Sequence, residues 1–440
     1  MNLTTLQEKI EQKTAVIGVI GLGYVGLPVA AMFAQKGFSV IGVDIKTERV
    51  EMINAGQNPI EGDEPGLADL LAGVTSTGNL RATADYDTLT QADIVLIDVE
   101  TPVDESNQPR YRALRAVCDS LGAVLSDGAM VIVESTIAPG TIEGVVRPLL
   151  EKSSGKQVND GFALGACPER VMPGKLLLNL RTMSRVCGGS TEETAVTMTQ
   201  LYRHIVEGDL DTADPITAEL VKTTENAYRD VQIAFANEVA LISESVGADV
   251  WRVRELVNKS PYRQMHLPGA GVGGHCIPKD PWLLAHGAGD DVPIRLIPQS
   301  RAINDGMPIH MADMLTSAFN HFGIDPRSSK TAVLGYAYLA DSDDTRNSPS
   351  ETLVAHLRQE NINVVIHDPW VAEYQGDLLT AVDGCDAVIL MVAHQAYKDL
   401  DLSALRNSLH TPILIDGRHF FDAARVKEAG LYYRCVGQGA

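Results

Sequence analysis

The sequence lacks any apolar run of the roughly 18 to 20 residues that a membrane span needs, and Met1–Lys13 is polar, without the apolar core of a signal peptide. Positive charge is also scarce, because 36 Lys and Arg stand against 57 Asp and Glu, for a formal net charge of −21. Such a balance disfavours non-specific binding to nucleic acid or to anionic membranes. We therefore expect a cytoplasmic protein with neither of these partners.

Cysteine pairs of the CxxC type are absent as well. The six cysteines are widely scattered, at Cys118, Cys167, Cys187, Cys276, Cys385 and Cys435. This spacing argues against a disulfide framework and against a zinc site, so no metal is expected. Each thiol is by default a small buried apolar group, and any other role has to come from its neighbours.

Biased tracts and internal repeats are not evident either. With 45% hydrophobic and 21% charged residues, the composition is that of a folded globular protein. A chain of 440 residues exceeds one ordinary hydrophobic core, so we expect two or three domains.

What the chain does contain, near its start, is a glycine-rich turn between a predicted strand and a predicted helix. This turn has the sequence Gly21-Leu22-Gly23-Tyr24-Val25-Gly26. Gly21 permits the tight turn, Gly23 lets the backbone approach a pyrophosphate, and Gly26 allows close packing of the helix on the strand. The helix N-terminus then offers unpaired N–H groups to the phosphates, so the pattern predicts a dinucleotide site.

An acidic residue about 20 positions further on completes this pattern. Asp44 ends the second predicted strand and is expected to bind the ribose hydroxyls and to repel a 2′-phosphate. The sequence therefore predicts NAD in preference to NADP, although Arg49 lies close by in the chain.

Two further predicted strands end in polar loops. Asp93–Asp98 is followed by Thr101, and Met130–Ser135 by Thr136. In open parallel sheets ligands bind at the carboxyl ends of strands, so these loops should face the nicotinamide half of the cofactor. Ordinary turn chemistry is the alternative for both threonines.

The pattern changes at Asp214-Pro215, a helix cap followed by proline at the first helical position. An unbroken helical stretch then runs to Gly247, on the order of 48 Å long. Lys222, Asn226 and Arg229 share one face of it because they are spaced four and three residues apart. They form either a functional site or a solvated polar stripe.

The last third returns to alternating strands and helices. Four segments read as strands: Lys330–Tyr338, Asn363–Pro369, Asp386–Ala393 and Thr411–Gly417. They predict a second α/β domain that begins at about Met311. It has no GxGxxG turn, so another kind of nucleotide ligand is expected there.

Cys276 lies in the stretch GAGVGGHCIPKDPWLL (269–284), where glycines leave a thiol unshielded. Lys279 and His275 can favour a thiolate, and Asp280 can orient a water or a lysine. A thiol is useful to a dehydrogenase when an aldehyde has to be oxidised again, because its thiohemiacetal can give up a hydride and become a thioester. The loop therefore indicates a four-electron oxidation of an alcohol to an acid, with a buried structural cysteine as the alternative.

Together these motifs resemble, over nearly the whole chain, the UDP-glucose/GDP-mannose dehydrogenase family, and within it the branch that acts on N-acetylhexosamines. The stretches that carry the resemblance are GLGYVGLPVA (21–30), ESTIAPGT (134–141), CPERVMPG (167–174), KTTENAYRD (222–230), LPGAGVGGHCIPKDPW (267–282) and DSDDTRNSP (341–349).

The resemblance implies an α/β fold in which two Rossmann-like, doubly wound domains are joined by a long central helix and a helical dimerisation domain. It implies an NAD-binding domain over residues 1–213, a dimer-forming middle over 214–310 and a UDP-sugar-binding domain over 311–440. A homodimer or a higher homo-oligomer is expected from it.

The resemblance also assigns roles to single residues. It implies the catalytic residues Cys276 (nucleophile), Lys222 (acid/base or oxyanion partner), Asn226, Asp280, Thr136 and Glu169. It implies sugar-nucleotide contacts at Arg170, Val171, Lys222, Asn226, Arg229, Arg263, Gly273 and Tyr338. It further implies that Arg346 reaches the NAD pyrophosphate, to which an ion pair with Asp343 or Asp344 is the alternative.

The chain departs from the family pattern at three positions. Leu339, after Tyr338, stands where the family usually has lysine, and Ser260 and Tyr262 stand where the branch tends to have histidine and arginine, with Arg263 one place away. Losing such a charged contact costs about 1.5–3 kcal/mol. These departures bear on the sugar more than on the reaction.

The expected reaction is oxidation at C6 of a UDP-N-acetylhexosamine to the uronate, with two NAD reduced per sugar. UDP-N-acetylmannosamine is the first choice and UDP-N-acetylglucosamine the nearest alternative, because the two differ in one stereocentre. A two-electron 3-hydroxyacid-type dehydrogenase and an inactive nucleotide sensor are the alternatives of other classes.

Overall fold

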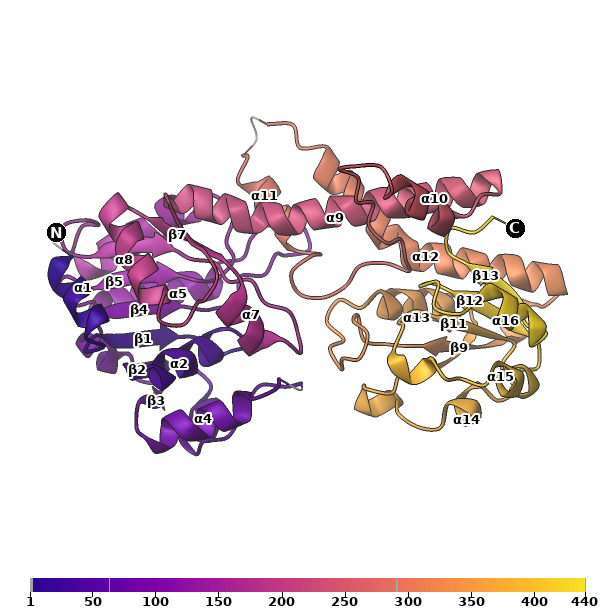
Figure 1. The fold of residues 1–440 in the computed structure, drawn as a ribbon, viewed down its shortest axis with the longest axis horizontal. Coiled ribbons are helices and arrows are strands. Elements are labelled where there is room, and N and C mark those ends of the chain that lie inside the picture. Colours follow the sequence, from indigo (N-terminus) through magenta and orange to yellow (C-terminus); the bar gives the residue numbers. More distant parts are fainter. Residues whose placement is uncertain (1–2, 63, 290–291, 440) are drawn as a thin grey trace. The chain divides into compact units, whose positions relative to one another are not determined.

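The computed structural model describes residues 3–62, 64–289 and 292–439, so the outer domain limits at residues 1 and 440 lie outside it. The chain divides into a first unit, Met1–Glu225 with Trp282–Val292, and a second unit, Asn226–Pro281 with Pro293–Ala440. Each unit contains a parallel-sheet α/β domain (Figure 1). The expected fold class of two Rossmann-like α/β domains is therefore confirmed.

In the described part of the first unit, eight strands form one sheet in the order β3-β2-β1-β4-β5-β6-β7-β8. Their bounds are β1 Val16–Ile20, β2 Ser39–Val43, β3 Leu80–Thr83, β4 Ile94–Ile97, β5 Met130–Val133, β6 Ala163–Ala166, β7 Arg185–Gly189 and β8 Leu210–Ala213. All neighbouring strands are parallel except β6 and β7. The order reverses between β1 and β4, which is where a dinucleotide crosses a doubly wound sheet.

Helices cover both faces of this sheet. They are α1 Thr4–Glu11, α2 Gly26–Gln35, α3 Thr47–Asn54, α4 Leu67–Ser76, α5 Arg112–Val124, α6 Arg147–Ser154, α7 Leu176–Thr182 and α8 Glu192–Tyr202. Along β5, Met130 and Ile132 join the core on one face, and Val131 and Val133 join the core on the other. Because successive side chains of a strand point to opposite faces, a strand buried on both sides reads as an uninterrupted apolar run.

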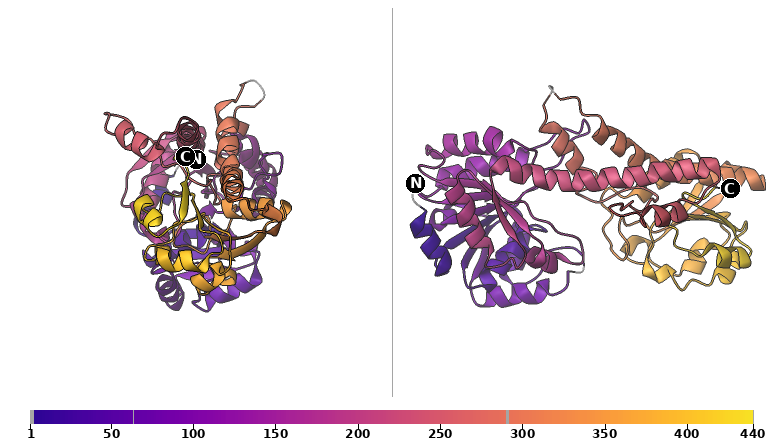
Figure 2. Two further views of the ribbon diagram at one scale, coloured as in Figure 1. Left: turned by 90° about the vertical axis from the view of Figure 1, so that its right-hand side faces the viewer. Right: turned by 45° about the horizontal axis from the view of Figure 1, so that its top comes forward.

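Helix α9 spans Pro215–Val246 and joins the two α/β domains, as the right-hand view of Figure 2 shows. It begins as predicted, because the Asp214 carboxylate accepts hydrogen bonds from the N–H (2.9 Å) and the hydroxyl (2.7 Å) of Thr217 and thereby caps the first turn. The division between the two units falls within this helix.

The described part of the second unit holds a parallel five-stranded sheet in the order β10-β9-β11-β12-β13. The strands are β9 Lys330–Leu334, β10 Asn363–His367, β11 Ala387–Leu390, β12 Ile413–Asp416 and β13 Tyr432–Cys435. The helices are α10 Val250–Val257, α12 Leu296–Phe322, α13 Pro349–Gln359, α14 Leu378–Val382, α15 Leu402–Ser408 and α16 Ala423–Glu428, while α11, Asp280–His286, crosses between the units. The order reverses between β9 and β11, which makes the loops after these strands the expected ligand edge.

Two details of the second sheet differ from the sequence-based expectation. The strand expected over Lys330–Tyr338 ends at Leu334, because Gly335 takes a positive φ of 88° and turns the chain out of the sheet. The last strand, β13, was not expected. Position 311, which is the predicted start of the second α/β domain, lies within helix α12.

Candidate active site

The glycine-rich turn between β1 and α2 has the geometry that a dinucleotide loop requires. Gly21 has a φ of 92°, and a Cβ placed on it would lie 2.2 Å from the carbonyl oxygen of Asp98. A Cβ on Gly26 would lie 2.0 Å from the carbonyl oxygen of Gly21, whereas a Cβ on Gly23 would meet nothing within 4 Å. Gly23 therefore leaves open space at the N-terminus of α2, and these residues fit an NAD pyrophosphate.

Asp44, at the end of β2, is buried and already holds this turn in place. Its Oδ2 accepts hydrogen bonds from Leu22 N (2.9 Å) and Arg49 Nη1 (3.0 Å), and its Oδ1 accepts one from Lys46 N (2.9 Å). Arg49 is thus held by Asp44.

A second carboxylate, Glu64, was missed by the sequence analysis. It is buried and accepts a hydrogen bond from the hydroxyl of Tyr24 in the glycine-rich turn. It also accepts bonds from Gly174 N (2.9 Å), at the end of the CPERVMPG stretch, and from Leu176 N (3.1 Å), two residues further on. Val25 and Val171 pack against the core on this face of the sheet. The sequence signal was an acidic residue in a loop, which by itself is too common to single out.

The two predicted threonine loops meet at the carboxyl edge of the first sheet. The hydroxyl of Thr101 donates a hydrogen bond to the carbonyl oxygen of Thr136. The loop after Thr136 is held by Glu219 of α9, whose carboxylate accepts bonds from Gly140 N (2.6 Å) and Ile142 N (2.8 Å). Burial raises the pKa of Glu219 from 4.5 to about 7.

The predicted substrate-side residues of the first unit differ in their exposure and in their partners. Arg170 forms a bidentate ion pair with Glu225, with Nη2 2.6 Å from Oε1 and Nε 2.8 Å from Oε2. Glu169 is buried, and its Oε2 has no hydrogen-bond partner in the described part of the chain. Such an atom can hold a water molecule. Lys222, on α9, is buried as well.

In the second unit, Cys276 lies on the loop before α11. All six cysteines lie in the described residues, and five of them are buried whereas Cys276 is partly exposed. Asn226 Nδ2 donates to Asp280 Oδ2 at 2.5 Å, so the structure brings these two predicted residues together. Lys279 Nζ lies 3.0 Å from Asp280 Oδ1, without hydrogen-bond geometry.

The cysteine loop packs against the loop that follows β9. A Cβ on Gly273 would lie 2.6 Å from Tyr338 Cβ, and one on Gly274 would lie 2.7 Å from Tyr338 Cε2. Glycine is therefore required at both positions by the close approach of Tyr338. Gly274 N also donates to the carbonyl oxygen of Arg346 at 2.9 Å, which fixes the two loops to each other.

The charges around the Cys276 thiol differ in part from the prediction that His275 and Lys279 favour a thiolate. Burial and the charges of Lys279 and Arg346 lower the pKa of His275, so its imidazole is neutral at pH 7 and adds no charge. Hydrogen bonding to Asp344 raises the pKa of Arg346, and Cys276 contributes to the same shift. Arg346 therefore supplies positive charge near the thiol, whereas the Lys279 ammonium lies beside Asp280. Arg346 forms the ion pair with Asp344 that was its alternative interpretation, at 2.5 Å.

Two other residues predicted to contact the sugar nucleotide are exposed. Arg229 and Arg263 are exposed on the second unit, and Arg263 Nη1 lies 3.5 Å from the carbonyl oxygen of Tyr262.

Arg418, which the sequence analysis missed, follows β12, and its Nε donates to Met391 O at 2.7 Å. A Cβ on Gly269, in the cysteine loop, would lie 2.7 Å from Arg418 Nη1. Burial lowers the pKa of Arg418 to about 10, so it remains a cation at neutral pH.

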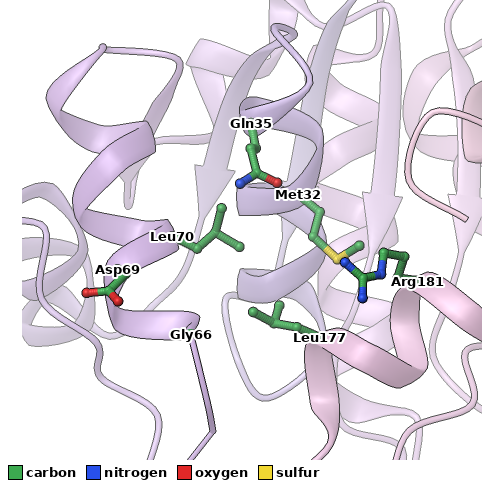
Figure 3. A pocket seen from close by; sticks show the side chains of 7 residues that line it. All are labelled: Met32, Gln35, Gly66, Asp69, Leu70, Leu177 and Arg181. Atoms are coloured by element: carbon green, nitrogen blue, oxygen red, sulfur yellow. The ribbon is translucent and has the colours of Figure 1, made fainter.

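A hollow of about 350 Å³ lies elsewhere, in the first unit (Figure 3). Its lining residues are Met32, Gln35, Gly66, Asp69, Leu70, Leu177 and Arg181. They include none of the predicted site residues, and Met32 and Gln35 lie at the end of α2 that is remote from the glycine-rich turn.

Two absences hold for the described residues. They contain no group of three or more His, Cys, Asp or Glu side chains that could hold a metal ion. None of their helices combines the length and the apolarity needed to cross a membrane.

Three models of the UDP-glucose/GDP-mannose dehydrogenase family match this chain in order: the NAD binding domain at residues 15–206, the central domain at 216–306 and the UDP binding domain at 332–423. The chain belongs to this family, and it is accordingly an NAD-dependent oxidoreductase of nucleotide sugars with a UDP-sugar-binding domain.

Individual relatives show which enzymes of this family the chain is similar to. The chain is 39% identical over 423 residues to a UDP-N-acetyl-D-mannosamine dehydrogenase from Pyrococcus horikoshii, covering 96% of this chain and 99% of that one. It is 35% identical to an NDP-N-acetyl-D-galactosaminuronic acid dehydrogenase from Ralstonia nicotianae, covering 93% and 97%. The solved structure of the UDP-D-ManNAc dehydrogenase from P. horikoshii superposes with a TM-score of 0.91 at 38% identity, over 96% and 99% of the two chains.

Proposed function

We propose that the protein oxidises UDP-N-acetyl-D-mannosamine at C6 to UDP-N-acetyl-D-mannosaminuronate, and that Cys276 carries the acyl group. One observation supports the thiol's role above all: Cys276 is partly exposed on a glycine-lined loop, whereas the other five cysteines are buried. A two-electron dehydrogenase has no use for such a thiol.

The proposed oxidation of the alcohol to the carboxylate has four steps. The C6 alcohol loses a hydride from its carbon and a proton from its hydroxyl oxygen, which gives an aldehyde. The Cys276 thiol adds to the aldehyde as a thiohemiacetal, which loses a second hydride and a proton to give a thioester. Water then cleaves the C–S bond, which releases the carboxylate, a proton and the free thiol. Each NAD, when bound at the glycine-rich turn, accepts one hydride, so two are reduced per sugar.

The chain's own residues handle the protons and the oxygen. We assign Lys222 as the acid/base or oxyanion partner of the reacting oxygen, with Asn226 as a second hydrogen-bond donor. Asp280 orients Asn226, since its Oδ2 accepts the Asn226 amide N–H. Thr136 and Glu169 hold the hydrolytic water, for which the free Oε2 of Glu169 offers an acceptor.

The remaining predicted residues bind the two ligands. Gly21, Gly23, Tyr24, Val25, Gly26, Asp44, Arg49, Thr101 and Thr136 bind NAD, with Arg346 as the proposed pyrophosphate contact. Arg170, Val171, Arg229, Arg263, Gly273 and Tyr338 bind the sugar nucleotide. Leu339 supplies no cation, so we assign Arg418, a partly buried cation beside the cysteine loop, to the same ligand.

We also propose a homodimer formed along α9. Tyr228, Phe235 and Ile242 are spaced seven residues apart on this helix and are 63%, 59% and 55% exposed. Apolar side chains at this spacing form one stripe, which is the pattern that packs against a second helix. Light scattering should give twice the chain mass, and Phe235→Glu should reduce it to one chain mass; a wild-type monomer would contradict the proposal.

The deciding experiment counts NADH per sugar consumed, with excess NAD and limiting UDP-N-acetylmannosamine, and separately with UDP-N-acetylglucosamine and UDP-glucose. Two NADH with the first sugar support the proposal, and two with the second name the epimer instead. Cys276→Ala should make no uronate while binding NAD as the wild type does, and Cys385→Ala, which alters a buried thiol of the same unit, should keep the yield of two. One NADH per sugar would favour a two-electron enzyme.

A further inference from the structure

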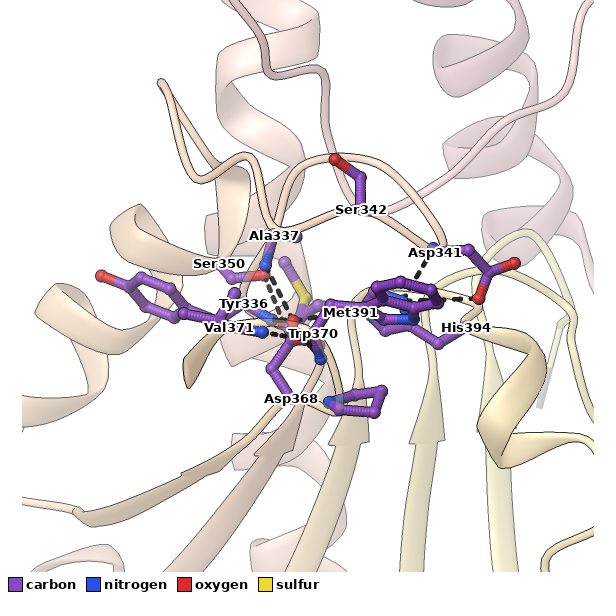
Figure 4. Close-up of polar contacts among 12 residues, drawn as sticks. Tyr336, Ala337, Asp341, Ser342, Ser350, Asp368, Trp370, Val371, Met391 and His394 are labelled. Atoms are coloured by element: carbon purple, nitrogen blue, oxygen red, sulfur yellow. Dashed lines mark hydrogen bonds and ion pairs between the residues drawn. The ribbon is translucent and has the colours of Figure 1, made fainter. Parts of the chain in front are cut away.

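A buried carboxylate, Asp368, organises the ligand edge of the second sheet (Figure 4). Its oxygens accept five hydrogen bonds, from the backbone N–H groups of Tyr336 (2.6 Å), Ala337 (2.9 Å), Trp370 (2.8 Å) and Val371 (3.1 Å) and from His394 Nε2 (3.1 Å). Burial alone raises the pKa of Asp368, but the bonds from His394 and from the backbone outweigh it and lower the pKa. Asp368 is therefore ionised at neutral pH.

His394, just after β11, is fully buried and engaged on both ring nitrogens. Nε2 donates to Asp368, and Nδ1 accepts the backbone N–H of Asp341 at 2.9 Å. These two partners require a neutral ring with its proton on Nε2. Asp341 also makes a second contact with this segment, because its Oδ1 accepts a hydrogen bond from the N–H of Gln395 at 2.9 Å.

The segment held in this way is the loop 335–348 after β9. Asp368 fixes its first residues through the N–H groups of Tyr336 and Ala337, and His394 fixes its middle through Asp341, which has a left-handed φ of 56°. This conformation is uncommon for residues other than glycine, and here the bond from the Asp341 N–H to His394 helps to hold it.

The same loop supports the cysteine loop, and both belong to the second unit. The carbonyl oxygen of Arg346 accepts Gly274 N (2.9 Å), and the carbonyl oxygen of Gly274 accepts Asn347 Nδ2 (3.1 Å). Cys276 follows two residues later. Asp368 and His394 thus hold the first part of the β9 loop, and the last part of the same loop is hydrogen-bonded to the segment that carries the thiol.

We infer that His394 is a positioning residue for the sugar nucleotide: by accepting the Asp341 N–H while donating to Asp368, it holds the loop 335–348, and with it Tyr338, in the conformation that binds this ligand. This inference rests on the proposed function. His394 is fully buried and acts through the loop rather than as a catalytic residue.

Two isosteric substitutions separate the two bonds. The side-chain oxygen of Asn in His394→Asn takes the place of Nδ1 and keeps the acceptor for Asp341, whereas the amide nitrogen of Gln in His394→Gln takes the place of Nε2 and keeps only the donor. His394→Gln should raise the KM for the UDP-sugar about tenfold with kcat within about twofold, and His394→Asn should stay near wild type. Equal KM values in both variants, or an equal loss in both, would overturn the inference.

Calorimetric titration with UDP alone separates this inference from the proposed function, because it needs no turnover. Weaker UDP binding to His394→Gln than to His394→Asn supports the positioning role even if the wild-type protein oxidises none of the tested sugars. Unchanged UDP affinity in His394→Gln refutes it even if the wild-type protein forms two NADH. Melting temperatures of the two variants serve as the folding control, and a KM that followed the melting temperature alone would count against the inference.

Discussion

The side-chain amide of Asn226 donates a hydrogen bond of 2.5 Å to the carboxylate of Asp280, across 54 residues of sequence. Asp280 is fully buried, and its second oxygen lies 3.0 Å from the Lys279 ammonium. The amide therefore has one fixed orientation, which leaves its oxygen and its other N–H for a ligand.

Asp280→Asn should lower kcat about 100-fold while changing the KM for the UDP-sugar little, because it removes the charge that orients Asn226 without removing bulk. Steady-state kinetics at saturating NAD measure both constants. Asp313→Asn, which changes an exposed side chain of the same unit, is the matched control and should behave as wild type. A pure KM effect at position 280 would show that the pair serves binding instead.

Cofactor preference should depend on Asp44. In Asp44→Ala, Arg49 loses its partner at 3.0 Å and becomes available to a 2′-phosphate. We expect the ratio of kcat/KM for NADP to that for NAD to rise about 10- to 100-fold.

The double variant Asp44→Ala/Arg49→Ala tests the cause of that change. It should lose most of the gain, since the released cation is gone. An unchanged preference in the single variant would mean that Asp44 is not at the ribose.

Glu219 should make stability depend on pH. Its pKa is raised from 4.5 to about 7 in the folded protein, chiefly by burial. The folded state therefore keeps a proton that the unfolded state releases, and the unfolding free energy falls as pH rises from 4.5 to about 7. Over that window the loss amounts to about 3 kcal/mol.

Glu219→Gln cannot titrate, so its cost in hydrogen bonding is the same at every pH. The unfolding free energy of Glu219→Gln minus that of the wild type should therefore increase from pH 5 to pH 8. Urea unfolding at the two pH values measures this difference. A difference between the two proteins that does not change with pH would contradict the raised pKa.

Tyr24→Phe should lower the unfolding free energy by about 1.5–3 kcal/mol, because it removes a hydrogen bond to the buried carboxylate of Glu64. Tyr262→Phe alters a 99% exposed tyrosine and should have no effect in the same denaturant series. Equal stability of both variants would show that the Tyr24 hydroxyl adds nothing to the fold.

Much of the molecule was predictable from contiguous sequence. The strand, glycine turn and helix at Gly21–Gly26, the cap at Asp214 and the course of α9 follow from local chemistry: glycine conformations, capping oxygens and helical periodicity. The family, too, could be recognised from short stretches, and the family models match this prediction.

Other features depended on which strands and loops become neighbours. Glu64 joins the glycine turn to a loop 110 residues away, and Arg418 reaches the cysteine loop from 147 residues away. His275 shows the same limit, since its lowered pKa depends on its burial and on Arg346, which is distant in sequence.

The sequence by itself therefore determined the α/β plan, the dinucleotide turn and the candidate thiol, because each is encoded within one short stretch. Only the tertiary structure decided which charges and hydrogen bonds surround those groups, including the His394–Asp368 pair behind the β9 loop. The physical reason is that burial and pairing depend on contacts between segments far apart in the chain, and no local pattern specifies them.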